Sequence, residues 1–159
     1  MSDSNYKNLS LNAKKSWFAA RFIFLLILLI PIPFILIGVH NKKIQLVVLA
    51  ILGLFIFLQL LNTFLYPYIE YKQWKYFIND EKVELIHGIY FITTSVIPIV
   101  RIQNINLNQG PINRIFKLTD LEIMTAGNNF TIPNIESSEA NKLCEFLREK
   151  INDAVKEDL

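Results

Sequence analysis

The sequence predicts a two-helix transmembrane hairpin, followed by a small barrel of bent antiparallel strands with a C-terminal helix over one end. Three observations predict this fold class. Two runs without a charged residue, Phe22–Val39 and Ile44–Ile69, follow each other closely. Apolar residues then alternate with a period of two over several short segments, as in half-buried strands. The C-terminal stretch instead carries an apolar stripe with helical spacing.

Each apolar run is long enough to cross ~30 Å of hydrocarbon as a helix that rises ~1.5 Å per residue. We expect a hairpin over residues 17–68, with spans at about 19–39 and 44–66. Pro31 and Pro33 should kink the first span or split it, because proline removes a helical hydrogen bond. We do not expect the first run to be a signal peptide, since it is long and Val39-His40-Asn41 lacks the small residues of a cleavage site.

Basic residues near the spans predict the orientation, since Lys and Arg favour the cytoplasmic side. The two flanks of the hairpin carry Lys7, Lys14, Lys15, Arg21, Lys72, Lys75 and Lys82, and the turn between the spans carries Lys42 and Lys43. We therefore expect a multi-pass protein of the cell membrane whose polar N-terminus (residues 1–16), C-terminus and folded domain (residues 70–155) all lie in the cytoplasm.

The second span contains a polar seam. Gln59, Asn62, Thr63 and Tyr66 share one helical face by their spacing. The seam could serve a partner helix or a ligand path, or it could form hydrogen bonds to the first span of the same chain. Neither span contains a charged residue between Phe22 and Val39 or between Ile44 and Ile69, which argues against an ion or proton carrier.

Beyond residue 70 the sequence predicts short antiparallel strands and one helix. Strands are expected over 74–78, 82–89, 95–108, 118–126 and 130–132, with a hairpin turn at Gly127-Asn128-Asn129 and a strand end at Pro133. Ser137 or Ser138 can cap the helix. Its apolar stripe comprises Ala140, Leu143, Cys144, Leu147, Ile151 and Ala154. We therefore expect Cys144, the single cysteine of the chain, to be a buried small apolar residue.

The segment VRIQNINLNQGP, residues 100–111, contains a conflict of parity. A regular strand that buries Ile105 and Leu107 would also point Arg101 and Gln103 into the core. A bulge near Gln103-Asn104 would remove the conflict by shifting the parity by one residue. Alternatively, Arg101 and Gln103 lie inward and are paired there, because a buried guanidinium needs a partner. The following INRIF should form a short helical turn that buries Ile112, Ile115 and Phe116.

The residues do not predict an enzyme, a metal site, a cofactor or a nucleic-acid binder. His40 and His87 lack metal-ligand spacing, and the sequence has neither a phosphate-binding loop nor a nucleophile motif. The carboxylates Asp80-Glu81 and Asp120/Glu122 should be solvated in turns or on polar strand faces. Residues 69–159 carry ten basic and thirteen acidic side chains, a net charge of −3, which disfavours nucleic acid.

The run VIPIVRIQNINLNQGPINRIFKLTDLEIMTAG resembles the core motif of the YdbS-like family of bacterial membrane proteins with a pleckstrin-homology-like domain. In that pattern a proline precedes Arg-Ile-Gln, the strand ends in Gln-Gly-Pro, and a turn with Arg-x-Phe leads into a strand that ends near Thr-Ala-Gly. Lys117 departs from the pattern, since glycine is usual there, and this puts the shape of that turn in question. The matching residues are Pro98, Arg101, Ile102, Gln103, Gln109, Gly110, Pro111, Arg114, Phe116, Thr125, Ala126 and Gly127.

The resemblance implies a pleckstrin-homology-like barrel with no enzymatic activity and no cofactor. It also implies a partner, a larger YdbT-like multi-span membrane protein with several such domains, and a role in resistance or immunity to membrane-active bacteriocins. An assembly of several copies of this chain stays open. The motif residues Pro98, Arg101, Gln103, Gln109, Gly110, Pro111, Arg114 and Phe116 would specify the fold or contact a ligand or partner. The alternative function is a non-catalytic membrane module that binds a lipid or an envelope ligand.

Overall fold

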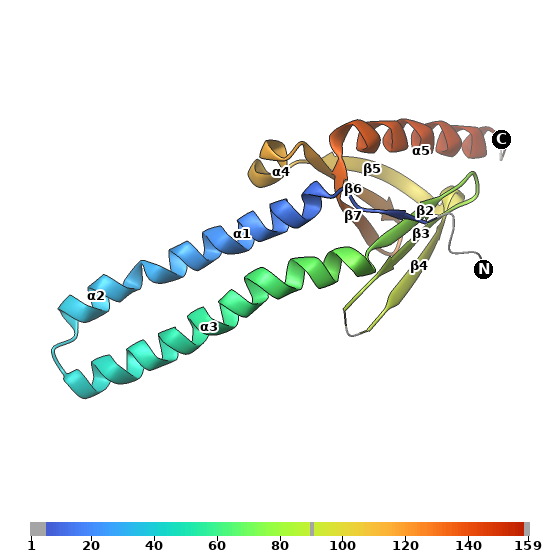
Figure 1. Cartoon of the computed structure of the whole chain (residues 1–159). Helices are drawn as coiled ribbons and strands as arrows, with labels where there is room; N and C mark the ends of the chain where they lie inside the picture. The colour runs from blue at the N-terminus through green and yellow to red at the C-terminus, as the bar shows by residue number, and fades with distance from the viewer. Residues whose placement is uncertain (1–5, 90, 158–159) are drawn as a thin grey trace. The chain divides into compact units, whose positions relative to one another are not determined.

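A computed structural model describes residues 6–89 and 91–157 of the chain, with side chains as far as Asp153 (Figure 1). The chain divides into two compact units. One is Trp17–Tyr68, and the other joins the residues up to Ser16 to those from Ile69 onward. The elements in chain order are β1 (Lys7–Asn8), α1 (Asn12–Leu29), α2 (Pro31–Gly38), α3 (Lys42–Gln73), β2 (Lys75–Ile78), β3 (Lys82–His87), β4 (Thr93–Pro98), the 3-10 turn η2 (Ile99–Arg101), β5 (Ile102–Asn108), α4 (Pro111–Ile115), β6 (Leu118–Thr125), β7 (Asn129–Glu136) and α5 (Ser137–Glu157).

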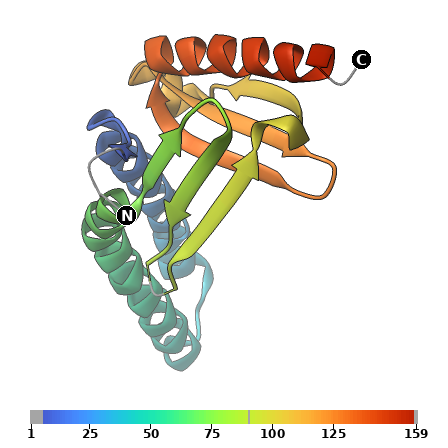
Figure 2. The same ribbon diagram turned by 90° about the vertical axis from the view of Figure 1, so that its right-hand side faces the viewer.

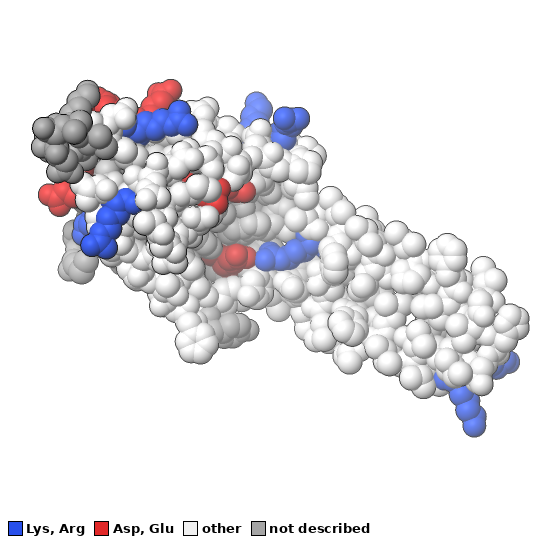
Figure 3. Space-filling view, turned by 180° about the vertical axis from the view of Figure 1, so that it is seen from behind, with Lys and Arg blue, Asp and Glu red and all other residues white. Residues whose placement is uncertain are grey.

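The first unit is a helical hairpin. The segments Asn12–Gly38 and Lys42–Gln73 are both long and apolar enough to cross a membrane. Figure 3 shows a white surface along the hairpin, with basic side chains at the end where the chain turns. Its large apolar side chains face outward, as a lipid environment requires; Ile37, for example, is 81% exposed.

Proline splits the first helix, as predicted. α1 ends at Leu29 and α2 begins at Pro31. Asn41 then caps α3, because its Oδ1 accepts hydrogen bonds from the backbone N–H groups of Lys43 and Ile44 at 3.1 and 3.4 Å. The turn is closed by Gln45, whose Nε2 donates to the Leu36 carbonyl at 3.0 Å.

The second unit contains two antiparallel sheets and a helix. The strand orders are β1-β2-β3-β4 and β5-β6-β7. α5 packs against β5, β6, β7 and η2 and runs along one end of the sheets (Figure 2). Its stripe buries Ala140, Cys144 and Leu147, as expected, with Leu143 and Ile151 half-buried; the Ala154 side chain lies outside the described residues.

The predicted bent sheets and C-terminal helix are confirmed, but the barrel is open. The expected long strand over 95–108 is interrupted by η2, so that β4 belongs to one sheet and β5 to the other. Within residues 6–89 and 91–157, no strand pairing joins the two sheets. The core between them is nevertheless continuous; its strand residues include Tyr76, Val83, Leu85, Ile97, Ile105, Leu118, Leu121, Ile123, Ile132 and Ile135.

Two local expectations were wrong. Pro133 does not end its strand, since β7 continues to Glu136. β7 is an edge strand, and its register with β6 shifts between the Leu121↔Ile132 and Thr119↔Ile135 pairs. Pro133 lies at this shift, and an edge strand or a bulge tolerates a proline, which has no N–H to donate. The short helix α4 forms as predicted, but Ile115 is 76% exposed and not buried.

Lys117 adopts the backbone conformation that favours glycine. Its φ is +55°, in the left-handed region, at the end of the turn between α4 and β6. The backbone on either side is fixed, because the Lys117 N–H donates to the Arg114 carbonyl at 3.3 Å and its carbonyl accepts from the Ser137 N–H at 3.0 Å. The turn is therefore one that suits glycine but is occupied by lysine.

Replacing Lys117 with glycine should stabilise the protein by about 0.5–1 kcal/mol, since relief of the left-handed strain exceeds the added chain entropy. Thermal unfolding of the full chain in detergent measures the change. Lys117→Ala is the matched control, because it removes the same side chain but keeps a Cβ at positive φ. An equal gain for alanine and glycine would show that the side chain, and not the backbone strain, limits stability.

Candidate functional site

The second unit has a groove where its barrel is open. It has a volume of about 540 Å³. One wall comes from the end of β4 and from η2, and the other from the turn between β6 and β7. The lining residues are Val96, Ile97, Pro98, Val100, Arg101, Gln103, Thr125, Ala126, Gly127, Asn128 and Phe130.

A β-bulge directs the polar residues of the groove outward. Ile102 pairs with Thr125 and Asn104 with Met124, so Gln103 is the extra residue between two registered pairs. The shift lets Ile102 and Ile105 both point into the core, where they are 4% and 3% exposed. Arg101 and Gln103 are exposed. The predicted bulge is thus confirmed, and the alternative with an inward-facing Arg101 and Gln103 is not observed.

The groove combines exposed apolar side chains with a few polar groups. Val96 is 54% exposed and Val100 is 71% exposed, while Pro98 and Phe130 add partly covered apolar surface. Arg101 is the one ionisable side chain among the residues that line it. A guanidinium beside exposed apolar side chains can bind a polar group of a partner while the apolar side chains are covered.

One wall of the groove is also a sheet edge. β4 is the last strand in its sheet order and pairs with β3 alone among the described strands. An edge strand offers unpaired backbone N–H and C=O groups to another extended segment. The groove can therefore hold apolar side chains while the adjacent edge hydrogen-bonds a partner's backbone.

The sequence motif divides into two groups in space. Pro98, Arg101 and Gln103 line the groove together with Thr125, Ala126 and Gly127. Ile102 is buried in the core at the start of β5, and the other motif residues lie at the corner between β5, α4 and β6, where Gly110 precedes α4 and Pro111 is its first residue. There Phe116 is half-buried and Arg114 is exposed.

Gln109 holds that corner together. Its Nε2 donates to the Leu118 carbonyl at 2.8 Å and to Ser137 Oγ at 3.2 Å. Ser137 Oγ also lies 2.8 Å from Thr119 Oγ1. These bonds connect the end of β5 to β6 and to the start of α5, which gives this part of the motif a structural role.

The polar seam on α3 has contacts within the hairpin unit. Thr63 is buried, and its Oγ1 donates to the Gln59 carbonyl of the same helix at 2.8 Å. The Tyr66 ring lies 5.0 Å from the guanidinium carbon of Arg21 on α1. Asn62 is exposed on the helix surface. The seam as an interaction site stays a prediction.

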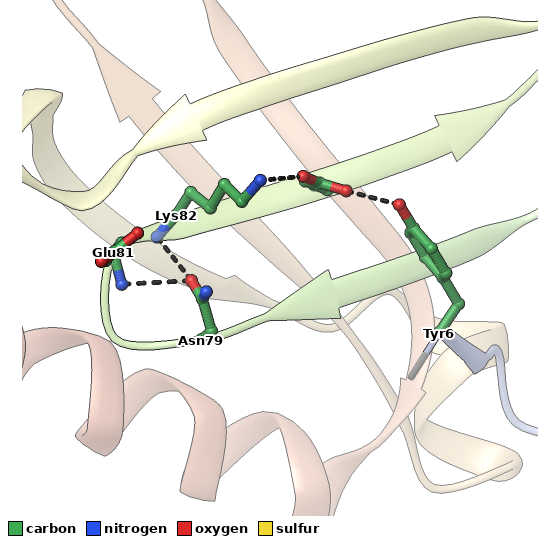
Figure 4. A network of polar contacts seen from close by, with 5 residues as sticks. Tyr6, Asn79, Glu81 and Lys82 are labelled. Atoms are coloured by element: carbon green, nitrogen blue, oxygen red, sulfur yellow. Dashed lines mark hydrogen bonds and ion pairs between the residues drawn. The ribbon is translucent and has the colours of Figure 1, made fainter. Parts of the chain in front are cut away.

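A buried carboxylate was not foreseen from the sequence. Glu84, on β3, is 4% exposed. It pairs with Lys82 Nζ at 2.5 Å and accepts a hydrogen bond from the Tyr6 hydroxyl (Figure 4). These bonds to Lys82 and Tyr6 lower the pKa of the Glu84 carboxyl below its ordinary value of 4.5. Tyr6 directly precedes β1, which pairs antiparallel with β2, so the N-terminal segment is part of this unit.

Because the pKa of Glu84 is lowered on folding, the unfolded chain binds more protons in acid. The stabilisation should be complete above the ordinary pKa and lost as the pH falls through the folded value. Glu84→Gln should cost roughly 1–3 kcal/mol at neutral pH and less in acid. Unfolding of the full chain at neutral pH and in acid measures the two losses of stability. Glu145→Gln, at an exposed position, is the control. An equal loss at both pH values would contradict the account.

A second network corrects an expectation about Asp120. This carboxylate is half-buried and not simply solvated: its Oδ1 accepts from the Asn134 N–H at 2.7 Å, and Asn113 Nδ2 lies 3.2 Å from its Oδ2. Asn113 Oδ1 in turn accepts from Ser16 Oγ at 2.7 Å. The network links β6, β7, α4 and the N-terminal part of α1, and its partners are too far apart in sequence for a local pattern to indicate it.

No metal centre emerges from the geometry. Among the described residues, no group of three or more His, Cys, Asp or Glu side chains is placed to hold a metal ion. Cys144 is a buried free thiol on α5.

Comparisons with known proteins agree with this architecture. A family model described as "Bacterial PH domain" matches residues 18–151. The chain is also similar to "UPF0699 transmembrane protein YdbS" of Bacillus subtilis (strain 168), with 30% identity over 84 residues. The match covers 53% of this chain and 53% of that protein, so the chain spans about half the length of the curated relative it matches. No solved structure matches the chain.

Proposed function

The chain belongs to the bacterial PH domain family and is a membrane protein of the YdbS type, and on this premise we propose that it is a non-catalytic adaptor subunit. Its hairpin anchors the domain to the membrane, and its groove docks a larger multi-span, YdbT-like membrane protein that carries domains of the same kind. The observation that carries the proposal is the groove, an apolar opening beside the edge of β4 that pairs with no other described strand. Among the residues that line it, Arg101 is the one ionisable side chain.

The shape of the opening supports a protein partner of the same fold. A domain with two separate sheets presents edge strands, and an edge strand of a related domain has the twist and backbone pattern needed to extend the β4 edge. Val96 and Val100 would then be covered by apolar side chains of the partner, with Arg101 and Gln103 as polar contacts beside them. A second copy of this chain could bind to the same surface. The identity of the protein captured in the purification described below distinguishes this assembly from docking of a larger partner.

Both flanks of the hairpin lie on one side of the membrane in this proposal, and the structure of the second unit supports it. β1 comes before the first span and pairs with β2, which follows the second span, with Lys7 opposite Tyr76 and Asn8 opposite Lys75. A chain that joins these strands in one sheet must cross the membrane an even number of times. The excess of basic residues on these flanks favours the cytoplasmic side.

Purification of the tagged full chain from native membranes in mild detergent tests the adaptor role. Mass spectrometry should identify a larger membrane protein with repeated domains of this fold in the purified complex. Recovery of this chain alone, under conditions that preserve other membrane complexes, would contradict the proposal. Capture of untagged copies alone would indicate a homo-oligomer.

We also propose that the complex contributes to resistance or immunity against membrane-active bacteriocins. The support is indirect: the resemblance to the YdbS-like family, the membrane anchor and a groove suited to docking. A deletion strain should become more sensitive to a panel of cationic pore-forming peptides, and the full chain supplied from a plasmid should restore resistance. Unchanged sensitivity across the panel would refute this role without affecting the adaptor proposal.

A further inference from the structure

We propose that the exposed pair Phe91-Ile92, in the loop just before β4, inserts into the membrane leaflet at the C-terminal end of α3. Phe91 is 89% exposed and Ile92 is 71% exposed, although they are adjacent large apolar residues in a folded domain. Exposed apolar side chains gathered at the tip of a loop mark a surface that is covered by something else. The inference rests on the membrane anchor and is independent of partner docking.

Two contacts tie this loop to the chain segment that leaves the membrane. Gln73 Nε2 donates a hydrogen bond to the Ile89 carbonyl at 3.3 Å. The Trp74 ring stacks on His87 at the end of β3, with 4.6 Å between ring centroids and 17° between ring planes. The loop is therefore held against the last residue of α3 and the residue that follows it.

The position of Gln73 places these contacts near the membrane surface. It is the last residue of α3, and the charge-free run of this helix ends at Ile69. At ~1.5 Å per residue, Gln73 lies only ~6 Å beyond that run along the helix axis. Lys72 and Lys75 flank Gln73 and Trp74 in the sequence, and such basic and aromatic residues are typical of the headgroup region.

Glycine fixes the shape of the loop before any membrane contact. Gly88 has a φ of +126°, and a Cβ at this position would come within 1.9 Å of the Phe91 carbonyl oxygen. Only glycine fits this close approach. The close approach of Gly88 to the Phe91 backbone therefore fixes where Phe91 starts before any membrane contact.

We expect lipid, and not the protein docked in the groove, to cover the apolar side chains of this loop. β4 begins directly after the loop, and Val96, the first of its residues that lines the groove, lies four residues beyond Ile92, which is about 13 Å at ~3.3 Å per residue. The groove can therefore hold a partner while the loop tip contacts lipid. The lipid surface next to α3 is already established by the span itself.

Depth-dependent quenching tests the insertion. The full chain with Cys144→Ala and Phe91→Cys, labelled with an environment-sensitive fluorophore, is reconstituted alone into phosphatidylcholine–phosphatidylglycerol vesicles. We expect blue-shifted emission, strong quenching by lipids brominated in the upper acyl chain, and weak quenching by iodide in the lumen and outside. The same label at Val100→Cys, 71% exposed in the groove, is the matched control and should show the opposite pattern.

The outcomes separate the alternatives. Strong iodide quenching at position 91 would place the loop in water and overturn the proposal. Protection of this label from both iodide and brominated lipid would indicate protein contact and would also overturn it. Gly88→Ala in the labelled protein should shift the emission to the red and reduce lipid quenching, since the backbone must rearrange; unchanged emission would contradict the role of this close approach. Failure of partner capture does not affect any of these readouts.

Discussion

Replacing Val100 with arginine should abolish co-purification of the larger partner while the protein remains folded and membrane-bound. Val100 is 71% exposed on η2, so the substitution does not disturb the core of the domain. In the complex, however, the new cation would be buried in the centre of the groove beside Arg101. An unpaired buried charge costs roughly 3–5 kcal/mol, and ~1.4 kcal/mol corresponds to a tenfold loss of affinity, so capture should fall at least 100-fold.

Ile115→Arg is the matched control for this experiment. Ile115 is 76% exposed, and like Val100 it neighbours an arginine, Arg114, but it lies on α4 and does not line the groove. The control should retain the partner at the wild-type level. Equal loss in both variants would show a non-specific effect of charge, and full retention in Val100→Arg would remove the groove from the interface.

Opposite accessibility of the hairpin turn and the folded domain is the second large effect that we expect. In intact cells, a membrane-impermeant maleimide should label His40→Cys in the turn and should label Ser138→Cys at the start of α5 only after permeabilisation; both positions are exposed. The native Cys144 is 4% exposed and should contribute little background, which the unsubstituted chain controls. The reverse pattern would place the domain outside the cell and would contradict the cytoplasmic orientation.

The features that were predictable from the sequence are those that depend on neighbouring residues. The charge-free runs predicted both long helices, and Pro31 predicted the break between α1 and α2. The conflict of parity around Arg101 and Gln103 indicated a bulge as one of two solutions, and the structure has the bulge, with Ile102 and Ile105 both buried.

The features that were missed depend on partners far apart in the chain. β1 is two residues long, too short to show alternation, and its register with β2 spans the whole hairpin. Glu84 lies in a strand where charge suggests exposure, yet Lys82 and Tyr6 satisfy it in a buried position. The opening of the barrel depends on η2, a turn of Ile-Val-Arg. The sequence pattern instead predicted one continuous strand through these residues.

The candidate site was predicted only as a set of residues. The motif singled out Pro98, Arg101 and Gln103, but their convergence with the β6–β7 turn depends on how the two sheets separate. Gln109, from the second part of the motif, has a structural role that needs no ligand, because it bonds to the Leu118 carbonyl and to Ser137 Oγ.

Site-specific photo-crosslinking in living cells tests the docking groove most directly. A photoreactive amino acid at position 100 of the full chain should yield one adduct with a larger multi-span membrane protein that carries domains of this fold, and the same group at position 115 should not. Absence of an adduct at position 100, or the same products from both positions, would contradict the groove as the docking surface.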